Sequence, residues 1–143
     1  MRTEAIVQRR DPGSGLYEGR VLLHLESTNT SLWCAYQGSA SDAIDKLSPG
    51  KRLLVAIRFR FANPKPTEIR IKALLPSTPD QACTSFTAIG TLEEKLREAD
   101  EEFYVLSSTI PVHFDPELGQ PPVLEDIKRW FSVTGEFFVE EWN

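Results

Sequence analysis

The stretch from Lys51 to Leu75 constrains the fold more than any other part of the chain. Its first part, KRLLVAIRFRF, ends in alternating apolar and basic side chains, and its last part, EIRIKALL, begins with the same alternation of apolar and charged side chains. Successive side chains of a strand point to opposite faces, so this period predicts two strands that each bury one apolar face. The intervening ANPKPT, residues Ala62–Thr67, predicts the turn of a hairpin.

The polar faces of the two predicted strands carry cations. We expect one row on a shared sheet face, with a further cation at the turn: Arg58, Arg60, Arg70 and Lys72, with Lys65 beside them. Residues 51–72 hold seven Lys/Arg and one acid, whereas residues 73–143 hold four bases and fourteen acids. This segregation predicts either a charged surface with a preferred partner or two surfaces that neutralise each other within the fold.

The length of 143 residues predicts a single domain, with a barrel-like core over 1–75 and an acidic extension over 76–143 packed on it. No apolar run approaches the roughly 20 residues that span a bilayer, and the first residues lack the apolar core of a secretory signal. We therefore expect an intracellular, by default cytoplasmic, protein with no membrane partner. Cys34 and Cys83 are expected as two reduced, partly buried thiols, with a single disulfide as the alternative.

Alternation and turn residues predict the remaining elements. Strands are expected at 3–10, 17–25, 31–37, 85–91, 103–108 and 133–141. Short peripheral helices are expected at Asp42–Leu47, Leu92–Glu101 and Val123–Phe131, and a loop at His113–Gln120. No internal repeat stands out. The pattern predicts a mainly β (α+β) protein.

The order of three strands, a short helix and two strands over residues 3–75 resembles the OB-fold, in which the helix lies between the third and fourth strands of a small, partly open barrel. The resemblance implies that Ala62–Thr67 is the loop between the last two barrel strands. OB-folds bind single-stranded nucleic acid or other proteins, so the resemblance implies a binding function of one of these kinds.

The chain shows no catalytic motif. It has no phosphate-binding loop and no nucleophile elbow, and His24 and His113 are its only histidines. His113 lies two residues from Asp115, between two prolines, which is a poor setting for an acid–base pair. We expect no enzymatic activity, no cofactor and no metal.

Binding residues are expected in two places. Trp33 and Tyr36 would stack on bases if either shares a face with the cations. Phe138 and Trp142 lie on the face of the last strand opposite Phe137 and Val139, and a helix or a partner subunit must cover them. The leading hypothesis is a subunit of a macromolecular complex, or a homo-oligomer, that meets an acidic partner through the basic hairpin. The alternatives are a single-stranded nucleic-acid binder of OB type, and a small-ligand carrier or small enzyme with a barrel pocket.

Overall fold

The computed structural model describes every residue except 1, 12–17, 38–45, 80–81, 99–100 and 143. Within these ranges the chain is mainly β, as predicted, with one 3-10 turn, η1 (Leu124–Asp126). The strands are β1 (Thr3–Asp11), β2 (Gly19–Leu25), β3 (Thr30–Tyr36), β4 (Arg52–Pro66), β5 (Ala73–Pro76), β6 (Ser85–Glu98), β7 (Glu101–Ser107), β8 (Pro111–Pro116) and β9 (Trp130–Trp142). Their pairing forms one mixed sheet in the order β1-β2-β3-β9-β4-β8-β7-β6-β5.

The chain divides into two compact units, and two long strands contribute to both. The first unit contains residues 1–57, 80–84 and 137–143, and the second contains residues 58–79 and 85–136. The 15-residue β4 therefore begins in the first unit and ends in the second, while the 13-residue β9 does the reverse.

In the first unit, strand pairing runs β4-β1-β2-β3-β9. β1 pairs antiparallel with both β4 and β2, β2 pairs antiparallel with β3, and β3 pairs parallel with the end of β9. Alternate side chains of these strands form a buried core, which includes Val7, Val21, Leu23, Leu32, Cys34, Tyr36, Val55, Phe137 and Val139. The period of two seen in the sequence thus places one face of each strand inside.

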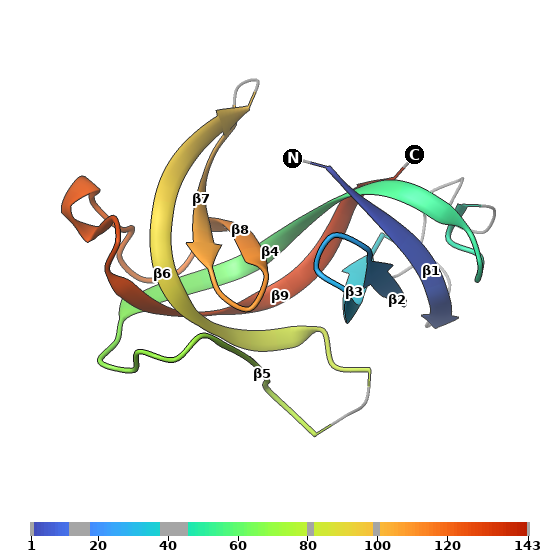
Figure 1. The fold of residues 1–143 in the computed structure, drawn as a ribbon, viewed down its shortest axis with the longest axis horizontal. Helices are drawn as coiled ribbons and strands as arrows, with labels where there is room; N and C mark the ends of the chain where they lie inside the picture. The colour runs from blue at the N-terminus through green and yellow to red at the C-terminus, as the bar shows by residue number, and fades with distance from the viewer. Residues whose placement is uncertain (1, 12–17, 38–45, 80–81, 99–100, 143) are drawn as a thin grey trace. The chain divides into compact units, whose positions relative to one another are not determined.

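In the second unit, strand pairing runs β9-β6-β7-β8-β4. β6 pairs antiparallel with both β9 and β7, β7 pairs antiparallel with β8, and β8 pairs parallel with the end of β4. Figure 1 shows how strongly β6 bends along its length. Its first half pairs with β9 and with the short β5, and its second half pairs with β7.

The two units therefore repeat one pattern of pairing. We call β1–β4 the first repeat and β6–β9 the second repeat. In the first repeat, the β1–β2 register shifts by one residue between Val7 and Arg9. In the second, the β6–β7 register shifts in the same way between Leu92 and Glu94. Both hairpins thus carry a β-bulge at the corresponding place, which bends the bulged strand.

The residue before each bulge also makes equivalent backbone bonds. Its backbone N–H donates to the carbonyl of the residue just before β4 or β9, the long strand of its repeat. Its own carbonyl accepts from the N–H of the residue that precedes that one in the chain. The bonds are Val7 to Lys51 (2.8 Å) and Gly50 to Val7 (2.7 Å), and Leu92 to Arg129 (2.9 Å) and Lys128 to Leu92 (2.6 Å). Gly50 and Lys128 both have a left-handed backbone, with φ of 91° and 73°.

The internal repeat was not expected, because the sequence shows no visible similarity between its two halves. The side chains in the core explain why. Equivalent core positions share burial but not identity: Cys34 and Phe114 pair with Val21 and Tyr104, and all four are buried. A hydrophobic core tolerates such exchanges when volume is redistributed among neighbours, so the pairing pattern persists without visible sequence similarity.

The predicted helix at Leu92–Glu101 is wrong, because most of this stretch lies in β6. Leu92 and Leu96 are four residues apart, a spacing that fits one face of a helix, whereas in the structure the β-bulge after Leu92 separates them onto different faces of β6. Antiparallel pairing with β7 makes this stretch a strand. An ion pair also links the two strands, with Lys95 Nζ 3.0 Å from Glu102 Oε2. Tertiary pairing overrides the helix propensity of these charged residues.

Three further predictions are wrong, and one lies largely outside the described residues. No helix spans Val123–Phe131: η1 ends early and β9 begins at Trp130. The loop predicted at His113–Gln120 contains part of β8. The turn predicted at Ala62–Thr67 is mostly strand, because β4 continues through an irregularity at Phe61, where φ is 56°. The helix predicted at Asp42–Leu47 falls mainly on residues that the structure does not describe.

The shared strands predict that neither repeat folds alone. A fragment of residues 1–79 lacks the β9 end that pairs with β3, and a fragment of residues 80–143 lacks the β4 end that pairs with β8. Each would expose unpaired strand edges. We expect little sheet signal in circular dichroism from either fragment and recovery of the full-length spectrum on mixing. A native-like spectrum from one isolated fragment would contradict this.

Candidate binding surface

The predicted basic hairpin does not form. The start of β4 pairs with β1 and its end with β8, whereas β5 pairs with β6. Residues 67–72, which include Ile69 and Arg70, contain no strand. The four cations are therefore not presented by two paired neighbouring strands.

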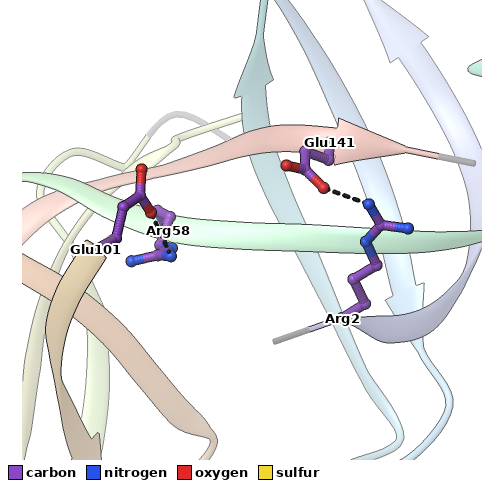
Figure 2. Close-up of polar contacts among 4 residues, drawn as sticks. All are labelled: Arg2, Arg58, Glu101 and Glu141. Atoms are coloured by element: carbon purple, nitrogen blue, oxygen red, sulfur yellow. Dashed lines mark hydrogen bonds and ion pairs between the residues drawn. The ribbon is translucent and has the colours of Figure 1, made fainter. Parts of the chain in front are cut away.

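Arg58 and Arg60 are engaged within the second unit. The Arg58 side chain is only 14% exposed, its Nη2 lies 3.0 Å from Glu101 Oε2, and its guanidinium lies 4.1 Å from the centre of the Phe103 ring. Figure 2 shows the ion pair with Glu101. Arg60 donates from Nε (2.8 Å) and Nη2 (2.5 Å) to the same oxygen of Glu136. Glu101 and Glu136 both come from the acidic residues 73–143. These two basic and two acidic side chains therefore neutralise each other within the fold.

A contrasting pair lies in the first unit. Arg2 Nη2 contacts Glu141 Oε2 at 2.5 Å, as Figure 2 shows, but both side chains are about half exposed. An exposed pair gains little, because water screens the attraction and two long side chains lose freedom. Arg58 differs because its guanidinium covers an aromatic ring and is shielded from solvent.

The predicted aromatic residues separate into core and surface. Tyr36 is 1% exposed and meets Trp142 edge-to-face, with ring centres 6.3 Å apart. Gly19 makes room for the tyrosine, since a Cβ there would lie 2.5 Å from its ring. Tyr36 is therefore closed to stacking with a ligand, and Trp142 is 9% exposed. Phe138 is partly buried.

Trp33 differs from Tyr36 because it lies on the outer face of β3, opposite the buried Leu32 and Cys34. It is partly exposed, and the guanidinium of Arg9 lies 5.9 Å from the centre of its ring. This cation and aromatic ring belong to the first unit, whereas the predicted row of cations belongs to the second.

A group of exposed aliphatic residues near the predicted site lies in residues 65–76, which we call the 65–76 segment. Ile69 is 51% exposed, Ile71 74% and Leu75 50%. Between and before them stand the exposed Lys65, Arg70 and Lys72. Lys72 donates to Ser107 Oγ at 2.8 Å. Sequence reasoning had placed both isoleucines in the core, because their alternation is the same as that of a half-buried strand.

The strand within this segment is protected against pairing with other strands. β5 has four residues, ends at Pro76 and pairs with β6 alone among the described strands. A very short edge strand flanked by lysine and proline is a common way to prevent edge-to-edge association. The exposed surface of the 65–76 segment therefore consists of side chains more than of unpaired strand backbone.

The remaining candidates for chemistry have structural surroundings. His113 packs against Phe103, with ring centres 5.4 Å apart, and burial together with the charge of Arg58 lowers the pKa of His113. Cys34 and Cys83 are free and buried, and burial raises the pKa of the Cys34 thiol, which makes it a poor nucleophile. Over the described ranges, no three His, Cys, Asp or Glu side chains gather as a metal site would require.

Comparison with known proteins adds no family. The sequence matches no protein-family model, and no curated protein is detectably similar to it. None of the helical structure in the described ranges is long and apolar enough to cross a membrane.

The two arginines in Figure 2 give a direct test of these environments. We expect Arg58→Ala to lower the free energy of unfolding by about 1–3 kcal/mol, because it removes a shielded charged hydrogen bond and uncovers Phe103. Arg2→Ala, the matched control, should cost about 0.5 kcal/mol or less. Urea unfolding measures both. Equal losses for the two variants would mean that Arg58 has no special role in the second unit.

Proposed function

We propose that this protein is a non-enzymatic binding subunit that meets an acidic protein partner through the 65–76 segment. The observation that carries the proposal is the grouping of three exposed aliphatic side chains with three cations in twelve residues. Burying one such aliphatic chain contributes about 1.5–3 kcal/mol, so a partner gains by covering them.

Charge favours an acidic partner over other proteins. The 65–76 segment holds Lys65, Arg70 and Lys72 against Glu68 as its only acid. Lys65 and Arg70 are exposed, and the structure gives neither an ion pair with another described residue. A partner with carboxylates between apolar side chains would neutralise these cations and cover the aliphatic chains together, and such complementarity mainly speeds and orients association.

The strand order supports an OB-like binding module. The first four strands of the first unit follow each other in the chain, and the fifth, from β9, runs parallel to the third. The resemblance inferred from sequence placed the fifth strand at residues 69–75, whereas here it comes from the end of the chain. OB-type modules serve protein and nucleic-acid partners alike, so the surface residues must decide between these partners.

A panel of labelled extended peptides, alternating glutamate with leucine or valine, tests the proposal by fluorescence anisotropy. We expect salt-sensitive binding that Ile71→Glu and Arg70→Glu each weaken about tenfold or more, since roughly 1.4 kcal/mol changes affinity tenfold. Leu54→Glu is the matched control, because Leu54 is 44% exposed and lies outside the segment. Its binding should equal that of the wild type. No binding to any acidic peptide, or no effect of the segment variants, would reject the proposal.

A second candidate function is single-stranded nucleic-acid binding by the first unit. It is favoured by the contact of Arg9 with the partly exposed Trp33 on the outer face of β3. Base stacking on one aromatic side chain contributes about 1–3 kcal/mol, and an adjacent arginine can neutralise a phosphate.

Binding to a labelled oligothymidine at low salt tests this candidate. Trp33→Ala should weaken binding about tenfold or more, whereas Arg2→Ala, which removes another arginine of the first unit, should have a small effect. Absence of binding at 50 mM salt, or equal loss in both variants, would reject nucleic-acid binding at this face. Neither result bears on the 65–76 segment.

A further inference from the structure

The repeated pairing pattern has a consequence for how two copies of the chain interact. Each unit is completed by a strand end from the other repeat. The end of β9 pairs with β3 through Ala35–Phe138 and Tyr36–Val139. The end of β4 pairs with β8 through Phe59–Phe114 and Ala62–Pro116. Both completing pairs are parallel, and both bury large side chains, including Phe59, Phe114, Tyr36 and Val139.

A single covalent connection joins the two repeats. It comprises residues 67–84, which include β5 and the segment that joins β5 to β6. The hairpin of β5 and β6 closes through a hydrogen bond from Ser77 N to Ser85 O at 2.9 Å. On the β6 side, Thr84 O accepts from Phe137 N at 3.0 Å, so this end of the connection is held in the first unit.

We infer that two copies of this chain can exchange their second repeats and form a reciprocal dimer with the strand pairings of the monomer. Every pairing between the repeats is equally available to a repeat from another chain, because the residues are identical. Only the path of the connection differs. Strand exchange of this kind is a low-cost route to dimers, and it is promoted when the connecting segment cannot close.

The length of the connection sets the balance between the two forms. In the monomer, the second repeat is held near the first at an effective concentration of the order of millimolar, as for a flexible linker. At lower protein concentration the monomer is therefore favoured. Shortening the connection between β5 and β6 should reduce this advantage, because it hinders the return of β6 to β5 of the same chain, and a shortened hinge favours exchange.

Light scattering coupled to size-exclusion chromatography tests the exchange on two full-length variants. Deletion of residues 77–80 should give a dimer at concentrations where the wild type is monomeric. Insertion of three glycines between Thr78 and Pro79, the control, should remain monomeric. The dimer should show the circular dichroism of the wild type and exchange labelled subunits over hours, because separation requires unfolding of both units. A folded monomeric deletion variant, or subunit exchange within seconds, would overturn the inference.

A second measurement applies if the deletion variant does not fold. The wild type is unfolded in guanidinium and refolded at about 1 μM and at about 1 mM, which spans the effective concentration expected for the connection. Exchange predicts a long-lived dimer only in the concentrated sample, and this dimer should persist after dilution. Monomer alone at both concentrations, or a dimer that dissociates at once on dilution, would overturn the inference.

Discussion

The fold depends on the pairing of two long strands, each of which belongs to both units. β4 leaves β1 and continues to β8, and β9 leaves β6 and continues to β3. Without these continuations, β3 and β8 would be unpaired edges, and the cores beneath them would lose Phe137, Val139 and Phe59. Burial of these side chains and satisfaction of the edge hydrogen bonds therefore come from the same two segments.

This constraint also explains where the charges are. Arg58 and Arg60 lie on the part of β4 that enters the second unit, and there they meet Glu101 and Glu136 from the acidic half of the sequence. Of the five cations in the predicted basic site, the exposed ones lie in the 65–76 segment, beyond or at the end of β4. The 65–76 segment begins at the end of the shared strand β4, and its two isoleucines are exposed.

Sequence reasoning predicted much of the local structure and little of the pairing. Alternation correctly located β1, β3, the start of β4 and β9, where buried residues alternate with more exposed ones. β7 was also located, although its residues 103–106 are all buried. It failed where a β-bulge hides the strand period, as between Leu92 and Leu96, and where exposed residues alternate, as for Ile69 and Ile71. It also failed after Phe61, where a turn was predicted. There the chain has a left-handed residue, and β4 nevertheless continues through the proline-containing residues 62–66.

The candidate site was predictable only in part, because ion pairs between distant residues depend on topology. Arg58 and Glu101 are 43 residues apart, and Arg60 and Glu136 are 76 apart. No local pattern records that β4 ends beside β8 or that β9 reaches β3. The exposure of residues 69–71 likewise follows from their place after β4 ends, since their own sequence is typical of a buried strand.

Native-state hydrogen exchange along β4 and β9 tests the shared-strand account most directly. If both strands join the units into one cooperative structure, protected amides in residues 52–57 and 58–66 should exchange with the same free energy of opening, close to that of global unfolding. The two parts of β9 should behave in the same way. Separate free energies for the two parts of each strand, with one unit opening while the other stays protected, would contradict the account.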